Sequence, residues 1–500
     1  FVFMGDLKRG LLSTHPGRIK DWSGQVHVEF PDVDLSQLGP HLPWKVNATQ
    51  GQGALRMWVD LNQGKVKQAT ADLILENAKA QLSPELQALS FKNIAGRVSV
   101  KPLNKGLDFS TEGLRFDTTD GLHWPGGNVK FSYAEAENGQ NAKGLFHGDK
   151  LDLLALRNIA LQLPLPNAAR EPLLDHKVSG LVNALHIEWT QLLGIHDTTF
   201  QINAANGRFE NFYFEGGRPG SPSAHWPGIE NADISFDMTG EGGQLKASVD
   251  GGAFSLAHIF EDPRIPLDKM QASIKWVKQK NQLSVPDWQL SLSNADLSGE
   301  WRGNWKPSTL PNSLGILDLQ GSVSKASAAR VHRYLPNTLP QNVRHYVRDA
   351  VLKGDVQNLA IKIKGDLQQL PFANPKDGEF RFAGKVKDVQ YAYAPPSNAA
   401  PSRNTAPTPP SAIWPVMNAV NGDIVFDRLN FKVNNASGKW GNVPFTQIKA
   451  EIPKLNNKVV VLVQGESRTN AQMLLNELRS SPVNNMLGGL FTQAQSTGTL

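Results

Sequence analysis

The 500-residue sequence contains no cysteine, which excludes disulfide frameworks, thiolate nucleophiles and cysteine-based zinc or iron–sulfur sites. It has no run of about 18 consecutive apolar residues, so we expect no segment of it to cross a membrane as a helix. A strong excess of charge of one sign is also missing, because 51 basic residues stand against 46 acidic ones. This balance argues against a nucleic-acid-binding protein.

Catalytic and metal-binding motifs are scarce as well. The HExxH, GxSxG and Walker patterns are absent, and the 12 histidines are scattered along the chain. Gly51 and Gly53 begin like a dinucleotide fingerprint, but Arg56 stands where its third glycine belongs. Glu261 and Asp262 precede a proline and are typical of a turn. We therefore predict a protein that is not an enzyme, with no catalytic residues, no metal site and no cofactor.

The dominant feature of the sequence is an alternation of apolar and polar residues with a period of two. This period gives each strand one apolar and one solvated face, as in antiparallel sheets. The run 459–463 is apolar at every position and predicts a more covered strand. The apolar positions of the clearest alternating runs are candidates for lining a groove: Leu290, Leu292, Leu359, Ile361, Ile363, Phe380, Phe382, Val386, Leu429, Phe431 and Val433.

Few segments have the spacing of apolar residues that predicts a helix. We expect short helices at residues 151–163, 324–335, 341–353 and near 470–479. Three times a short helical segment comes before a glycine and then an alternating strand, and these glycines are Gly53, Gly180 and Gly354. The unequal intervals between them indicate a degenerate repeat of long period.

This repeat predicts four stretches of chain. Residues 1–50 would start a groove segment with a short helix, and three groove repeats would follow at 51–180, 181–353 and 354–500. The second repeat would end in the helices 324–335 and 341–353. Residues 394–412, rich in proline, serine and alanine, are expected to form a loop in the third.

Two arrangements of the apolar strand faces remain open. The faces can pack against each other in ordinary β-sandwiches. Alternatively, the fold is mainly β and elongated, with one twisted, curved antiparallel sheet whose apolar face stays open as a hydrophobic groove. The small number of helices favours the groove, and about 25–30 strands at ~4.8 Å each would extend it to roughly 120–140 Å. An exposed apolar strip of that size requires an apolar ligand such as lipid tails. The pattern does not decide which strand face is concave.

Several longer stretches resemble one family. They are GGAFSLAHIFEDPRIPLDKMQASIKW at 251–276, LSLSNADLSGEWRGNW at 290–305 and VHRYLPNTLPQNVRHYVRDAVLKGDVQNLAIKIKGDLQQLPF at 331–372. In this order they closely resemble the YhdP family, the large AsmA-like and TamB-related envelope proteins of Gram-negative bacteria. The resemblance implies a repeating β-groove rod in the periplasm, attached to the inner membrane by an N-terminal anchor that we expect to lie outside this segment.

The resemblance also implies a function without catalysis. Proteins of this family are implicated in moving phospholipids toward the outer membrane and in maintaining its barrier. We therefore expect a bridge-like lipid-transport groove whose partners are phospholipids, the inner membrane and, further, the outer membrane and envelope proteins, with no nucleic acid. The alternative is a structural or assembly scaffold of the envelope that binds protein partners.

Overall fold

The computed structural model describes residues 1–10, 17–38, 47–81, 88–124, 126–136, 141–161, 174, 176–193, 198–217, 226–395, 414–455 and 459–499. The chain forms two compact units. The first unit contains Phe1–Gly216 and Gly228–Ser248, and the second contains Gly217–Pro227 and Val249–Leu500. Strand β14 (Gly242–Ser255) contains the boundary between them.

The first unit is an antiparallel meander. Two short strands, β7 (His123–Trp124) and β10 (Leu151–Asp152), pair with β6 and β11. The long strands pair in the following order: β1 (Val2–Arg9), β2 (Trp22–Asp34), β3 (Asn47–Asn62), β4 (Lys65–Gln81), β5 (Leu89–Leu103), β6 (Gly106–Thr118), β8 (Asn128–Ala134), β9 (Ala142–Asp149), β11 (Val178–Leu193), β12 (Thr198–Phe214) and β13 (Gly228–Thr239).

The second unit repeats this architecture. From β15 to β24, each strand pairs with the next strand along the chain: β15 (Arg264–Gln279), β16 (Gln282–Ser293), β17 (Leu297–Lys306), β18 (Ile316–Ser327), β19 (Val351–Asp366), β20 (Gly378–Tyr391), β21 (Met417–Asp427), β22 (Asn430–Trp440), β23 (Val443–Ile452) and β24 (Leu462–Glu466). The 24 strands of the described residues belong to one antiparallel sheet. This confirms the prediction of a mainly β fold built on an open antiparallel sheet with few short helices.

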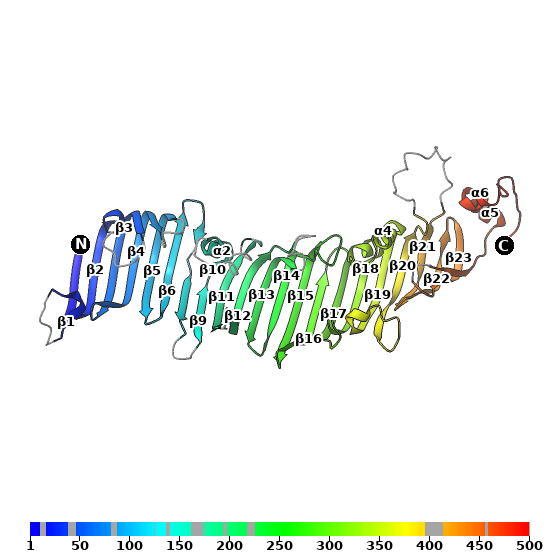
Figure 1. Cartoon of the computed structure of the whole chain (residues 1–500). Coiled ribbons are helices and arrows are strands. Elements are labelled where there is room, and N and C mark those ends of the chain that lie inside the picture. The colour runs from blue at the N-terminus through cyan, green and yellow to red at the C-terminus, as the bar shows by residue number, and fades with distance from the viewer. Residues whose placement is uncertain are drawn as a thin grey trace, which may run out of the picture. The chain divides into compact units, whose positions relative to one another are not determined.

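Apart from the 3-10 helices η1 (Ile19–Asp21) and η4 (Leu367–Gln369), the helices of each unit lie along one edge of its strands (Figure 1). In the first unit these are α1 (Leu35–Leu38) and α2 (Leu153–Leu161). In the second they are the 3-10 helix η3 (Ala328–Tyr334), α4 (Gln341–Ala350), α5 (Ala471–Ser480) and α6 (Pro482–Met486). We call this the helix edge of the second unit. The turns at the opposite ends of its strands, at 280–281, 307–315, 367–377, 428–429 and after β23, form its hairpin edge, which carries only the single 3-10 turn η4 (Leu367–Gln369) among the described residues.

Two clusters of buried hydrophobic side chains in the first unit include residues of its helices. Around α1 the buried cluster consists of Val33, Leu35, Leu55, Leu75 and Ala78. Around α2 it consists of Phe116, Trp124, Leu151, Ala155 and Val182, of which Leu151 and Val182 have no exposed surface. The helices therefore cover the end of the apolar sheet face rather than the whole of it.

A buried ion pair attaches η3 to the helix edge of the second unit. The Arg333 guanidinium donates to Asp296 at 2.5 Å and to Asp262 at 2.8 Å, and the exposed fractions of the Arg333 and Asp296 side chains are 17% and 9%. The Tyr334 hydroxyl donates to the same Asp296 carboxylate at 3.2 Å, and burial raises the pKa of Tyr334 to about 12. The hydroxyl therefore stays protonated at neutral pH and remains a donor.

Removing the Asp296 charge should destabilise the second unit. We expect Asp296→Asn to lower the free energy of unfolding by about 2 kcal/mol, because Arg333 then keeps only the exposed Asp262 as a counter-ion. Asp349→Asn is the matched control, since its partner Arg348 is largely exposed and such pairs contribute less than about 1 kcal/mol. Urea unfolding measures both, and equal losses would contradict this account of Asp296.

The helix predictions are confirmed in part. The helix expected near 470–479 is α5, which ends at Ser480. The helix expected at 341–353 ends at Ala350, and residues 351–353 begin β19. The segment 324–335 is only a 3-10 helix from Ala328, with 324–327 in β18. Of the segment 151–163, residues 151–152 form β10, α2 spans Leu153–Leu161, and the rest lies outside the described residues, as does 396–412 of the expected loop.

The prediction of a covered strand at 459–463 is wrong. Only Leu462 and Val463 belong to β24, and residues Val459 to Val463 expose between 51% and 65% of their surface. Among the described residues β24 pairs on one side only, with β23. A continuous apolar run therefore occupies a sheet edge, where neither packing nor a second strand covers it.

Candidate apolar groove

The candidate residues of β19 and β20 lie on one face of the second unit. Directly opposed residues of an antiparallel pair have their side chains on the same side of the sheet. Ile361 is opposed to Phe382, and Ile363 is opposed to Phe380. Leu359, two residues before Ile361, is opposed to Val323 of β18. The sequence alternation therefore continues across strands, and the apolar side chains form rows.

Four phenylalanines from β20, β21 and β22 form the centre of this face. Phe382 is opposed to Phe426, and Phe426 is opposed to Phe431. The ring centroids of Phe380 and Phe382 lie 5.0 Å apart, those of Phe380 and Phe426 lie 5.7 Å apart, and both pairs meet edge to face. Sequence reasoning missed Phe426, although Ile424 and Phe426 have the same period of two as the candidates. In the same rows, Val433 is opposed to Ile424.

Val386 and Leu429 differ in how they relate to this face. Val386 is opposed to Val356 of β19 and to Gly422 of β21, so it belongs to the same rows. Leu429 lies in the two-residue turn between β21 and β22, outside either strand. Its alternation with Phe431 therefore continues past the end of the strand, and its side chain is half-buried at the hairpin edge.

Leu290 and Leu292 lie on the same face beside a set of tryptophans. Leu290 is opposed to Trp301 of β17, and Leu292 is opposed to Gly299. A Cβ atom built at Gly321 would approach Trp301 to 2.3 Å, so the indole lies directly over this glycine. Trp288 and Trp305 lie in the same way over Gly303 and Gly315. The glycines leave room for these rings to lie against the sheet. The alternation of Trp and Gly at 299–305 is the one sequence feature from which this could have been predicted.

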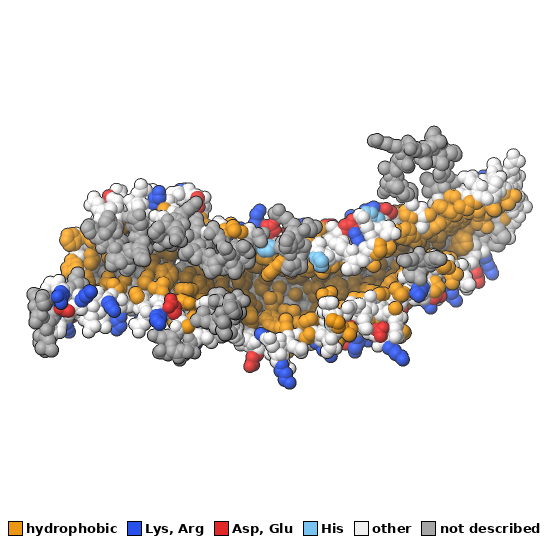
Figure 2. Space-filling view, in the orientation of Figure 1, with side chains coloured by type: hydrophobic (Ala, Val, Ile, Leu, Met, Phe, Trp, Pro, Cys, Tyr) orange, Lys and Arg blue, Asp and Glu red, His pale blue; other side chains and the backbone are white. Residues whose placement is uncertain are grey.

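We call this face of the second unit the groove floor. Figure 2 shows apolar side chains gathered in a hollow over these strands. All eleven candidate residues are half-buried, neither sealed in a core nor fully exposed. The floor comprises Met270, Ile274, Trp288, Leu290, Leu292, Trp301, Trp305, Leu317, Leu319, Val323, Leu359, Ile361, Ile363, Phe380, Phe382, Val386, Ile424, Phe426, Phe431, Val433, Ala450 and Ile452.

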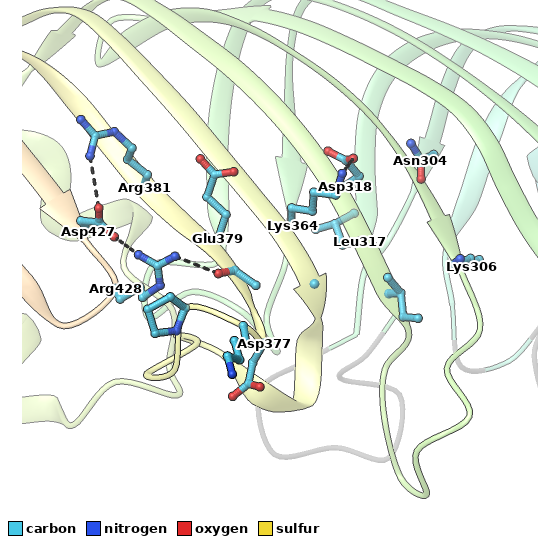
Figure 3. A pocket seen from close by; sticks show the side chains of 15 residues that line it. Asn304, Lys306, Leu317, Asp318, Lys364, Asp377, Glu379, Arg381, Asp427 and Arg428 are labelled. Atoms are coloured by element: carbon cyan, nitrogen blue, oxygen red, sulfur yellow. Dashed lines mark hydrogen bonds and ion pairs between the residues drawn. The ribbon is translucent and has the colours of Figure 1, made fainter.

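The opposite face of the same strands is charged and internally paired. Lys364 pairs with Asp318 at 3.2 Å, and Arg381 pairs with Asp427 at 3.2 Å, across neighbouring strands (Figure 3). Hydrogen bonds from Lys385 and then Asn435 hold the pKa of Asp423 below its ordinary value. Ladders of this kind are typical of a solvated sheet face.

The hollow in Figure 3 belongs to this charged face. It has a volume of about 720 Å³ and includes acidic and basic side chains in similar number. Arg428 donates to Asp427 at 2.5 Å and to the carbonyl oxygen of Gly378 at 3.0 Å, and Asp427 also accepts from Arg381. Because Asp427 pairs with Arg381 and Arg428, and Lys364 pairs with Asp318, most charges in the hollow form a structural ion-pair network. Lys306 and Lys376 also line the hollow, and neither has an ion-pair partner among the described residues. Groups of three or more side chains suited to metal binding are absent from the described residues.

The first unit has the same division into faces. A row of phenylalanines crosses three of its strands: Phe109 of β6 is opposed to Phe131 of β8, which is opposed to Phe146 of β9. Trp189 of β11 lies over Gly144, where an added Cβ would approach its ring to 2.0 Å. On the other face, Arg97 and Asp72 pair at 2.6 Å. Each unit therefore presents one apolar and one charged face.

These observations decide between the two arrangements left open by the sequence. A β-sandwich needs a second sheet against the apolar face, and the strands of the described residues all belong to one sheet. Within the described residues, the elements that lie over the apolar face of each unit are the short helices at its helix end. What remains is an uncovered apolar floor with half-exposed aliphatic and aromatic side chains, a surface suited to hydrocarbon.

Among the described residues, no helix has both the length and the apolar character needed to cross a membrane. A model of the YhdP protein family matches residues 4–500. No curated protein and no solved structure matches the chain.

Proposed function

Because this chain belongs to the YhdP family, we propose that it transports phospholipids without catalysis, holding their acyl chains against the groove floor. The family suggests lipid transport in the cell envelope, and the proposal extends this to movement across the periplasm between the inner and outer membranes in support of the outer-membrane barrier. The observation that carries it is the row of half-exposed apolar side chains from β15 to β23, over which the described residues place no second sheet.

The energetics of hydrocarbon transfer support this use of the floor. An acyl chain of about 16 carbons loses on the order of 12 kcal/mol when it moves from an apolar surrounding to water, at ~0.8 kcal/mol per CH₂. A lipid between two membranes therefore needs an apolar path along its whole route. The ten strands β15 to β24, at ~4.8 Å each, provide roughly 45 Å of such a path within the second unit.

The nature of the floor suits movement rather than storage. Its side chains are mainly Val, Ile, Leu, Phe and Trp, with Met270 and Ala450, and they offer dispersion contacts at every step. The tryptophan rings occupy the space above glycines such as Gly321 and Gly303, so they fill the floor at positions without a side chain. A lipid on such a surface meets a succession of nearly equal sites.

The proposed location follows from the family and from the function. We propose that the chain works in the periplasm of a Gram-negative bacterium and is attached to the inner membrane by a segment outside residues 1–500. Its partners would then be phospholipids, the two membranes and envelope proteins, without nucleic acid.

Site-specific photocrosslinking in cells tests the proposal. A photoreactive phenylalanine analogue at Ile363, Phe382 or Val433 should form adducts with phospholipid, because these positions face the floor. The same analogue at Lys362 or Arg381, one residue away on the charged face, is the matched control and should give no lipid adduct. Adducts with proteins alone at the floor positions would favour an envelope scaffold and reject lipid transport.

A further inference from the structure

The hairpin edge of the second unit carries a row of lysines. Lys280 lies in the turn after β15, Lys306 ends β17, Lys376 lies in the loop after β19 and Lys454 follows β23. All four residues are exposed. Successive turns at this edge are two strands apart, which is about 10 Å. Neighbouring lysines of the row therefore lie about 10 or 20 Å apart along the edge.

Several cations elsewhere in the unit are paired with carboxylates, whereas exposed strand lysines such as Lys269 and Lys449 have no such partner among the described residues. At the helix edge, Arg333 pairs with Asp296 and Arg344 pairs with Glu261. On the charged face, Lys364 pairs with Asp318 at 3.2 Å. Within the part of the chain that the structure describes, the four hairpin-edge lysines have no carboxylate oxygen within 4.0 Å. Their charge is therefore available to a ligand.

The carboxylates at the hairpin edge offset the charge of this row only in part. Asp366 is buried and accepts hydrogen bonds from Ser308, from Ser313 at 2.5 Å and from the backbone N–H of Gln368. Asp427 is occupied by Arg381 and Arg428. Asp377 is the exposed carboxylate of the loop that holds Lys376. The edge thus keeps a net positive charge.

Exposed leucines accompany the lysines at the same tips. Leu283 follows the turn of Lys280, Leu314 lies in the loop after Lys306, and Leu370 lies in the loop of Lys376, with exposed fractions of 48%, 76% and 40%. An apolar side chain beside an ammonium group matches the boundary in a phospholipid where the hydrocarbon ends and the phosphate begins. The hairpin edge is therefore the side of the groove whose chemistry complements that boundary.

We propose that phospholipid headgroups follow the hairpin edge of the second unit while their acyl chains lie on the groove floor, and that this edge favours anionic phospholipids over zwitterionic ones. This inference rests on the proposed lipid transport and adds the side of the groove and the class of headgroup. Exposed lysines attract a phosphate weakly because water and salt screen them, so a headgroup can pass from one to the next without being trapped.

Charge reversal of the row tests this inference. The purified chain is incubated with vesicles of equal phosphatidylglycerol and phosphatidylethanolamine, and the lipids that remain bound after separation are quantified by mass spectrometry. Wild type should be enriched in phosphatidylglycerol by about threefold or more, and the enrichment should fall at high salt. The variant K280E/K306E/K376E/K454E should lose the enrichment and keep its total bound lipid.

A second variant separates the position of the lysines from the overall charge. K269E/K275E/K387E/K449E changes four exposed lysines on the strands instead of at the hairpin tips, and it should retain the enrichment. The inference is overturned if both variants lose it equally, or if the hairpin-edge variant keeps it. It is also overturned if that variant loses vesicle binding but not headgroup preference, because the edge would then contact membranes. Absence of any bound lipid in wild type would instead reject the proposed function.

Discussion

Replacing Phe382 with aspartate should reduce lipid transfer at least tenfold while the sheet still forms. The Phe382 ring lies in the middle of the floor, with its centroid 5.0 Å from that of Phe380 and 6.3 Å from that of Phe426. An ionised carboxylate at this point holds water, and covering it with an acyl chain costs several kcal/mol after relaxation. Because the residue is half-exposed, the aspartate can stay hydrated in the lipid-free protein, which preserves the fold.

The matched control for this prediction is Val425→Asp. Val425 is opposed to Ala383 and to Lys432, on the charged face and one residue from Phe426. A carboxylate there meets a lysine and solvent, so lipid transfer should remain near the wild-type rate. Transfer of fluorescent phospholipid between vesicles, together with circular dichroism, measures both variants. Equal transfer by the two variants would mean that the floor has been assigned to the wrong face. Unfolding of Phe382→Asp would mean that Phe382 belongs to a closed core and not to an open floor.

Gly354→Ala should destabilise the second unit by about 3 kcal/mol or more. Gly354 has a φ of 119°, a conformation that residues with a Cβ atom essentially do not adopt. A Cβ atom would also lie 2.6 Å from the Cα and a Cγ atom of Val389 on the neighbouring strand. Both the strain and the clash fall on backbone and buried atoms, which cannot move away cheaply.

Gly251→Ala separates these two effects. Gly251 also has a positive φ, 69°, but no heavy atom lies within 4 Å of a Cβ built there. Its substitution should cost about 1 kcal/mol, the usual penalty of a left-handed conformation. Urea unfolding and amide exchange in β19 and β20 measure the difference. If the two alanine variants lost the same stability, the close approach of Val389 would have no energetic role.

The three glycines found by their place after helical segments share this property. Gly53, Gly180 and Gly354 all have positive φ, at 148°, 129° and 119°, and each lies against the neighbouring strand. The sequence pattern therefore identified positions with a common backbone role, although it suggested a helix-ending glycine at 354. Gly354 instead lies within β19, because residues 351–353 already pair with β20.

The errors at helix ends have one physical cause. Residues 351–353 continue the helical spacing of 341–350, and 324–327 begin a plausible helical run, yet both form ladder hydrogen bonds with adjacent strands. A sheet partner that is distant in sequence outweighs a weak local propensity. The same limit applies to Phe426, whose alternation is visible, but whose place among Phe380, Phe382 and Phe431 depends on register.

The sequence by itself determined that the strands alternate and that each has one apolar face, because side chains on a pleated strand point to opposite sides with a period of two. It did not determine that these faces align. Asn358 has a positive φ of 50° at an interruption of the β19–β20 register. This extra residue in β19 keeps Val356 and Ile361, which are five positions apart, in the same rows as their partners on β20. Since a slip of one residue would turn a whole strand over, only the tertiary pairing decided that the apolar faces join into one uncovered floor.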